Sequence, residues 1–166
     1  MIKEFKIFES INDGVVVYHG GDELTDNSIK DGGIFTTNNK KAAMWFVNNR
    51  IEYGAWLTKM MIKIENPLTE KNKGFENKWI PILDEAGIDY TFENGEFYCL
   101  DIIKNGGYME WNYLELFYIK EFVDVAIKHG YDGIIGWDVL DNYNIKVFIP
   151  FLKKNIKIIE NKYFEE

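Results

Sequence analysis

VVVYHGG, residues 15–21, joins a run of β-branched and aromatic residues to a polar end that is rich in glycine. Residues of this kind favour strands, so Val15–Tyr18 is predicted to be a buried strand that stops at His19. The glycines that follow allow the backbone to turn or to approach a ligand closely. We therefore expect a ligand pocket where this strand ends.

The segments on either side of this strand carry further strand and helix signals. Phe5–Phe8 is predicted as an edge strand, and Ile34–Thr37 as a short strand that follows a glycine-rich turn. Asn38 or Asn39 can accept hydrogen bonds from the free N–H groups of a helix that runs from Lys40 to about Asn48. A short strand followed by a helix is therefore expected soon after the residues of the expected pocket.

The middle of the chain gives weaker signals. Residues 56–64 alternate between apolar and polar positions, which predicts another strand. Residues 69–111 are expected to form a mainly helical insertion, with helices near 81–86 and 97–104. Pro81 would lie in the first turn of the former helix, where proline is well tolerated.

The last third of the chain gives the clearest helix, over residues 113–128. We then expect strands at 132–136, 146–149 and 156–159, with a polar turn at 138–144. This order of strands and helices predicts an α+β fold and not a doubly wound parallel sheet.

The composition is typical of one acidic globular domain spanning residues 1–166. Apolar residues make up 46% of the chain and aromatic residues 16%, and the formal net charge is −8. Such a charge argues against direct binding to nucleic acid, which needs a basic face. One cysteine, Cys99, and two histidines are too few for a disulfide within the chain or for a cysteine- or histidine-led metal site. We expect a cytoplasmic monomer with no segment that spans a membrane.

Three segments taken together resemble the ADP-ribosyltransferase superfamily. They are VYHGG at 17–21, GGIFTTNNKKAA at 32–43, and YDGIIGWD at 131–138 followed by VFIP at 147–150. The family also places Asn-Pro-Leu after a strand, as residues 66–68 do here. The resemblance covers most of the chain and is nearest to small transferase domains of phages and mobile elements.

The resemblance implies a fold of two small antiparallel or mixed sheets with flanking helices. It implies an enzyme that transfers ADP-ribose from NAD to a protein target inside a bacterial host cell. A phage-encoded inhibitor of a host defence complex, similar to an anti-CRISPR ADP-ribosyltransferase, would fit this description.

Several residues of this chain match cofactor-binding positions of the family. His19 matches the histidine that hydrogen-bonds the ribose of NAD, and Gly20 the glycine whose backbone pairs with the nicotinamide amide. Phe35 and Trp45 match aromatic positions against the nicotinamide, which suits a flat, charged ring. Thr37 is a further cofactor-binding candidate.

The start of the helix near Lys40 is expected to meet the pyrophosphate of NAD. Backbone N–H groups at a helix N-terminus bind anions, and Lys41 adds a positive charge. Lys41 is therefore included among the cofactor-binding candidates.

The chemistry of the family also needs a carboxylate that stabilises positive charge on the ribose. The family usually has a glutamate at the start of the strand before Val-Phe-x-Pro, and this chain has Asn144 there. Asp138 and Asp141 lie just upstream, and an anti-CRISPR ADP-ribosyltransferase places an aspartate similarly to Asp138. We expect Asp138 to be the catalytic acid, with Asp141 second and His19 assisting.

Each of these residues also has a purely structural interpretation. His19 can be a half-buried side chain with its hydrogen bonds satisfied, and Phe35 and Trp45 can be ordinary core aromatics. Asp138 can be a turn residue and Lys41 a solvated helix residue.

Two other functions compete with ADP-ribosyl transfer. An acidic protein can bind and block a nucleic-acid-binding partner, although the 27 acidic residues here are interleaved with 19 basic ones. An RNA 2′-phosphotransferase of the same fold would need clustered basic residues, and the sequence has too few of them.

Overall fold

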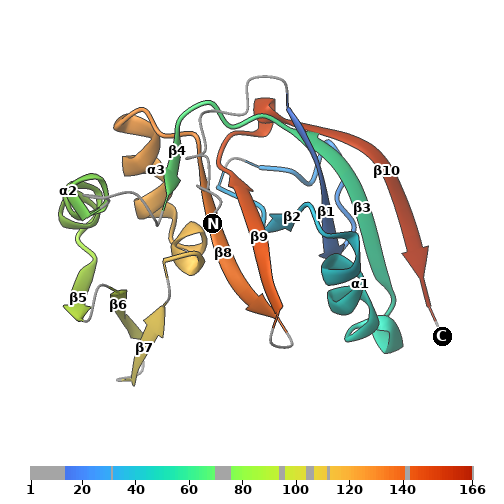
Figure 1. The fold of residues 1–166 in the computed structure, drawn as a ribbon, viewed down its shortest axis with the longest axis horizontal. Helices are drawn as coiled ribbons and strands as arrows, with labels where there is room; N and C mark the ends of the chain where they lie inside the picture. Colours follow the sequence, from blue (N-terminus) through green and yellow to red (C-terminus); the bar gives the residue numbers. More distant parts are fainter. Residues whose placement is uncertain are drawn as a thin grey trace, which may run out of the picture.

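The computed structural model describes residues 14–30, 32–69, 76–93, 96–103, 107–111, 113–140 and 143–165. They form a mixed α+β fold, as the sequence predicted, with one large sheet and one small sheet (Figure 1). The predicted edge strand at Phe5–Phe8 lies outside the described residues. No helix in the described part of the chain is long and apolar enough to span a membrane.

The large sheet has seven strands in the order β10-β3-β1-β2-β9-β8-β4. Their bounds are β1 Val15–Gly21, β2 Thr36–Thr37, β3 Ala55–Ile62, β4 Pro67–Thr69, β8 Gly133–Leu140, β9 Tyr143–Pro150 and β10 Ile156–Phe164. Of the described strand pairs in this sheet, β4 with β8 is parallel and the others are antiparallel.

The large sheet is continuous, whereas the resemblance implies two small sheets. The two-residue strand β2 joins its halves, because Tyr18 of β1 pairs with Thr37, and Thr36 and Thr37 pair with Phe148 and Val147 of β9. The Thr36 and Thr37 hydroxyls donate to the carbonyl oxygens of Phe148 and Lys146, at 2.5 and 2.8 Å. Side-chain hydrogen bonds thus reinforce a joint that has very few backbone pairs.

The small sheet shows that the insertion is not mainly helical. It has the order β5-β6-β7, with bounds β5 Asp89–Glu93, β6 Glu96–Ile103 and β7 Gly107–Trp111. The predicted helix over 97–104 is wrong, because residues 96–103 form the central strand of this sheet. A run of β-branched and aromatic residues such as 97–103 suits a strand once a partner lies on each side.

Three helices accompany the sheets in the described part of the chain, α1 Lys40–Asn48, α2 Glu76–Ala86 and α3 Lys120–Lys128. The structure confirms the predicted helix at 40–48 and its cap, since the Asn39 Oδ1 accepts from the backbone N–H groups of Lys41 and Ala42. Helix α2 starts five residues earlier than predicted and contains Pro81 in its interior.

The helix predicted over 113–128 is interrupted. Glu115–Tyr118 forms a short 3-10 helix, η2, and Ile119 is extended before α3 begins. In one continuous helix Phe117 and Phe122 would lie about 140° apart around the axis. The break allows both of these side chains to enter the same core.

Three buried clusters of the described residues pack on the large sheet. Ile134 of β8 and Val147 of β9 pack with residues of α2 and α3, such as Trp79 and Phe122. A second cluster includes residues from both halves of the sheet, Val17, Met60, Ile62, Ile64, Ile135 and Phe148. Helix α1 covers the half that contains β3, where Ala43 and Val47 pack on Ala55 and Leu57.

Strands β8 and β9 form a longer hairpin than the sequence suggested. The predicted polar turn at 138–144 is wrong, because Asp138 pairs with Ile145 and the ladder continues to Leu140 and Tyr143. Asp138 therefore has a fixed strand position, with its side chain direction set by the pleat.

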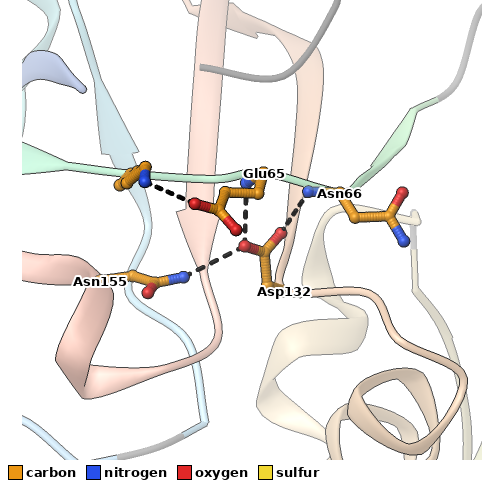
Figure 2. Close-up of polar contacts among 5 residues, drawn as sticks. Glu65, Asn66, Asp132 and Asn155 are labelled. Atoms are coloured by element: carbon orange, nitrogen blue, oxygen red, sulfur yellow. Dashed lines mark hydrogen bonds and ion pairs between the residues drawn. The ribbon is translucent and has the colours of Figure 1, made fainter. Parts of the chain in front are cut away.

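Asp132 connects the start of β8 to two other parts of the chain (Figure 2). Its carboxylate accepts from the backbone N–H groups of Glu65 and Asn66 at 2.8 and 2.9 Å, and from Asn155 Nδ2 at 3.2 Å. Asp132 thereby fixes the β3–β4 connection, with Asn66-Pro67-Leu68, against the strand that carries Asp138.

Candidate functional site

The candidate site lies where β1 and the chain before β2 separate. Tyr18 with Thr37 is the one ladder position described between these two strands. Strand β1 continues to pair with β3 through His19, Gly20 and Gly21. The edge of β1 that faces away from β3 is therefore not covered by β2 over these last three residues.

A cleft of about 600 Å³ opens at this place. Its walls come from β1, the segment before β2, helix α1, the η2 region and strand β8. Five residues predicted from sequence line it, namely His19, Gly20, Phe35, Thr37 and Asp138. The size is within the usual range for small-molecule sites.

His19 is held in one orientation by the backbone of the opposite wall. Its Nδ1 lies 2.9 Å from the Phe35 carbonyl oxygen, so Nδ1–H donates and Nε2 is left as an acceptor. Burial lowers the pKa of His19 below 6.5, with a smaller opposing effect from the bond to Phe35. At neutral pH the side chain is thus a neutral imidazole that can accept a hydrogen bond from a ligand hydroxyl.

Gly20 allows helix α1 to lie directly on the end of β1. A Cβ at this position would be 2.1 Å from the Ala43 carbonyl oxygen. This close approach brings the next turn of α1, with Phe46, to the cleft.

Four aromatic rings form one wall. Phe35 lies edge-on to Phe46 with ring centroids 6.1 Å apart, and 6.4 Å from Phe117. The rings of Phe117 and Tyr118 are 3.9 Å apart and tilted by 34°. All four residues line the cleft, which makes this wall suitable for a flat ligand ring.

Three carboxylates reach the cleft from different elements. Asp138 comes from β8, Glu115 from η2, and Asp22 from the residue after β1. Asp138 Oδ1 accepts from the backbone N–H of Val139 at 2.8 Å, which restricts how the carboxylate can turn.

One cation, Arg50, faces these carboxylates among the residues found to line the cleft. Its Nη1 lies 3.3 Å from Asp22 Oδ1. Arg50 is also the single arginine of the sequence. The cleft therefore combines several negative groups with one positive group at the end of helix α1.

Thr37 lines the cleft but already has partners. Its hydroxyl donates to the Lys146 carbonyl oxygen and accepts from the Asn39 N–H at 3.1 Å. These bonds fix the joint of the sheet and the start of α1, so Thr37 shapes the cleft through the backbone.

Two other candidates do not line the cleft. Trp45 and Lys41 are exposed on α1 and are not among its lining residues. Trp45 lies on the side of the helix opposite Ala43 and Val47, which pack on the sheet, whereas the adjacent Phe46 lines the cleft. Asp141 lies outside the described residues.

Asn144, the residue at the usual glutamate position, is exposed on β9 and does not line the cleft. Within the described residues no three His, Cys, Asp or Glu side chains come together as metal ligands.

No protein-family model matches the chain, and searches of curated proteins and of solved structures find no match either.

Sequence reasoning missed Arg50, Glu115, Tyr118, Phe46 and Asp22 as site residues. The sequence did offer one indication for Arg50, because it is the single arginine in a chain with 18 lysines. Glu115 and Tyr118 had none, because they were predicted to lie on a regular helix whose break only packing reveals.

Proposed function

We propose that this chain is an ADP-ribosyltransferase that uses NAD as co-substrate and modifies a protein. The observation that carries the proposal is the meeting of three distant sequence segments in one cleft. His19 and Gly20, Phe35, and Asp138 come from three different segments of the chain. They are the residues that the resemblance marks as cofactor-binding and catalytic.

The chemistry of the cleft supports this proposal. The neutral Nε2 of His19 can accept from a ribose hydroxyl, because Nδ1–H is engaged with Phe35. The aromatic wall offers faces and edges to a pyridinium ring. The uncovered edge of β1 at Gly20 offers backbone groups to the carboxamide of nicotinamide.

In the proposed reaction the bond between ribose C1′ and the nicotinamide nitrogen breaks, and its electron pair leaves with nicotinamide. A nucleophile of the target protein then forms a bond to C1′ and loses its proton. Positive charge develops on the ribose between these events, and a nearby carboxylate stabilises it. We assign this role to Asp138.

We also propose that the fold is ADP-ribosyltransferase-like. A sheet with a two-residue joint, a helix packed on the strand that ends in His-Gly, and a cleft beside that joint fit an ADP-ribosyltransferase-like arrangement.

The test is to incubate the purified protein with NAD labelled in the adenine part, alone and with a bacterial lysate. We expect release of nicotinamide and transfer of the label to protein. Asp138→Asn should reduce the rate by about a hundredfold or more, which is typical for loss of a charge that stabilises a transition state. Asp124→Asn, an exposed aspartate on α3 outside the cleft, is the matched control.

Two results would overturn the proposal. One is wild-type protein that neither releases nicotinamide nor labels any protein. The other is Asp138→Asn with full activity while Glu115→Gln also keeps it, since no tested carboxylate would then serve the reaction.

A further inference from the structure

The cleft contains a small space that is bordered by both His19 and Arg50. A Cβ placed on Gly21 would lie 3.2 Å from His19 Nε2 and 3.6 Å from Arg50 Nη1. Gly21 has a φ of 152°, a backbone conformation that residues with a side chain rarely adopt. The chain thus keeps this space free of a side chain between an acceptor nitrogen and a guanidinium.

The guanidinium of Arg50 can exchange its ion-pair partner, Asp22, for a ligand. It contacts Asp22 through a single pair of atoms at 3.3 Å, and the side chains are 58% and 92% exposed. Exposed ion pairs of this kind contribute little stability. A phosphate, in contrast, can bind two N–H groups of a guanidinium at once.

The position expected for the pyrophosphate from sequence, the start of α1, is less suitable. Asn39 Oδ1 already accepts from the N–H groups of Lys41 and Ala42, at 3.0 and 3.3 Å. The Lys41 side chain is exposed and does not line the cleft. The cation that does line the cleft is Arg50, which follows the opposite end of α1.

We propose that Arg50 binds the phosphate next to the ribose of a nucleotide co-substrate, with Asp22 competing for the same guanidinium. This deepens the proposed function and rests on it for the identity of the nucleotide, NAD. A ribose held at His19 Nε2 has its 5′-phosphate as the adjoining group, which matches the adjacency of the two side chains across Gly21. The ligand class is a ribonucleotide with a 5′-phosphate or diphosphate.

The test compares ligands that differ by one phosphate, titrated by calorimetry at low salt. Nicotinamide riboside lacks the phosphate, nicotinamide mononucleotide carries it, and inorganic pyrophosphate lacks the nucleoside. In wild type the mononucleotide should bind about tenfold more tightly than the riboside, as expected for one charge-assisted contact. Arg50→Ala should remove this difference and leave riboside binding unchanged, while Arg50→Lys should retain part of it.

Two further variants control for charge. Lys41→Ala removes one positive charge from helix α1 outside the cleft, and the preference for the phosphate should stay as in wild type. Asp22→Asn should strengthen mononucleotide binding severalfold, because the competing carboxylate is neutralised. Binding of pyrophosphate equal to that of the mononucleotide would indicate a free-anion site and overturn the nucleotide assignment.

The outcomes separate the two proposals. If nicotinamide is released from NAD but Arg50→Ala and Lys41→Ala weaken mononucleotide binding equally, the phosphate site is wrong and the transferase proposal stands. If the preference for the phosphate depends on Arg50 but no nicotinamide is ever released, the site stands and the transferase proposal is wrong.

Discussion

His19 Nδ1 lies 2.9 Å from the carbonyl oxygen of Phe35, across the gap that opens between β1 and the chain before β2. This hydrogen bond connects β1 to the segment before β2 through one side chain. It also determines that the imidazole presents Nε2 to the cleft. The polar tip of β1 is thus both a structural bridge and a candidate ligand contact.

The pKa of His19 leads to a first prediction. Burial lowers this pKa below the ordinary 6.5, so the folded protein favours the neutral ring. The contribution of His19 to stability is therefore fully present above pH 6.5 and is lost as the pH falls through the folded-state pKa. An NMR titration of the two histidine rings should give a midpoint below 6.5 for His19, with signals assigned by His129→Gln.

The same titration bears on function. Ligand binding should persist as the pH falls to 6.5 and weaken only when His19 becomes protonated, because Nε2 then donates instead of accepting. A midpoint at or above 6.5 would contradict the burial described for this ring.

A second prediction distinguishes two neighbouring aromatic residues on α1. Phe46 lines the cleft, whereas Trp45 is 37% exposed and lies outside it. Phe46→Leu should raise the KM for NAD, the proposed co-substrate, about three- to tenfold, since a flat ring face and edge are lost. Trp45→Leu should leave the KM as in wild type, and equal effects of the two substitutions would contradict the orientation of α1.

A third prediction concerns the contact between β1 and α1. Gly20→Ala would place a Cβ 2.1 Å from the Ala43 carbonyl oxygen, a backbone atom that cannot move without the helix. We expect a loss of about 2 kcal/mol in the free energy of unfolding, as is typical for an overpacked core. Chemical denaturation would measure it.

Gly87→Ala serves as a comparison for Gly20→Ala, because no atom lies within 4 Å of a Cβ at that position and the cost there comes from its φ of 67° alone. Gly20→Ala should also weaken NAD binding, whereas Gly87→Ala should not. Wild-type binding by a stable Gly20→Ala variant would show that α1 does not rest on Gly20.

A fourth prediction concerns Asp132. Its carboxylate accepts from two backbone N–H groups and from Asn155, so Asp132→Ala leaves these donors without their acceptor. We expect a loss of about 2–3 kcal/mol in the free energy of unfolding. Asn155→Ala removes only the contact at 3.2 Å and should cost less than half as much, which the same denaturation series would measure.

Local sequence signals determined several elements because the physics behind them is local. The strand at 15–18, the helix at 40–48 and its Asn39 cap follow from side-chain shape and from hydrogen bonds between residues close in the chain. The order of these elements also predicted the α+β class, and five of the residues that were candidates for the site line the cleft.

Tertiary structure decided what depends on partners distant in the sequence. Residues 97–103 became a strand because neighbouring strands lie on both sides, and the helix over 113–128 broke because Phe117 and Phe122 enter one core. Arg50 and Glu115 reach the cleft only through packing of α1 on Gly20 and through that break. The sequence by itself therefore determined the strand that ends at His19, since propensity acts within a few residues. Only the fold decided which charges face it, because contacts between distant segments depend on how the whole chain packs.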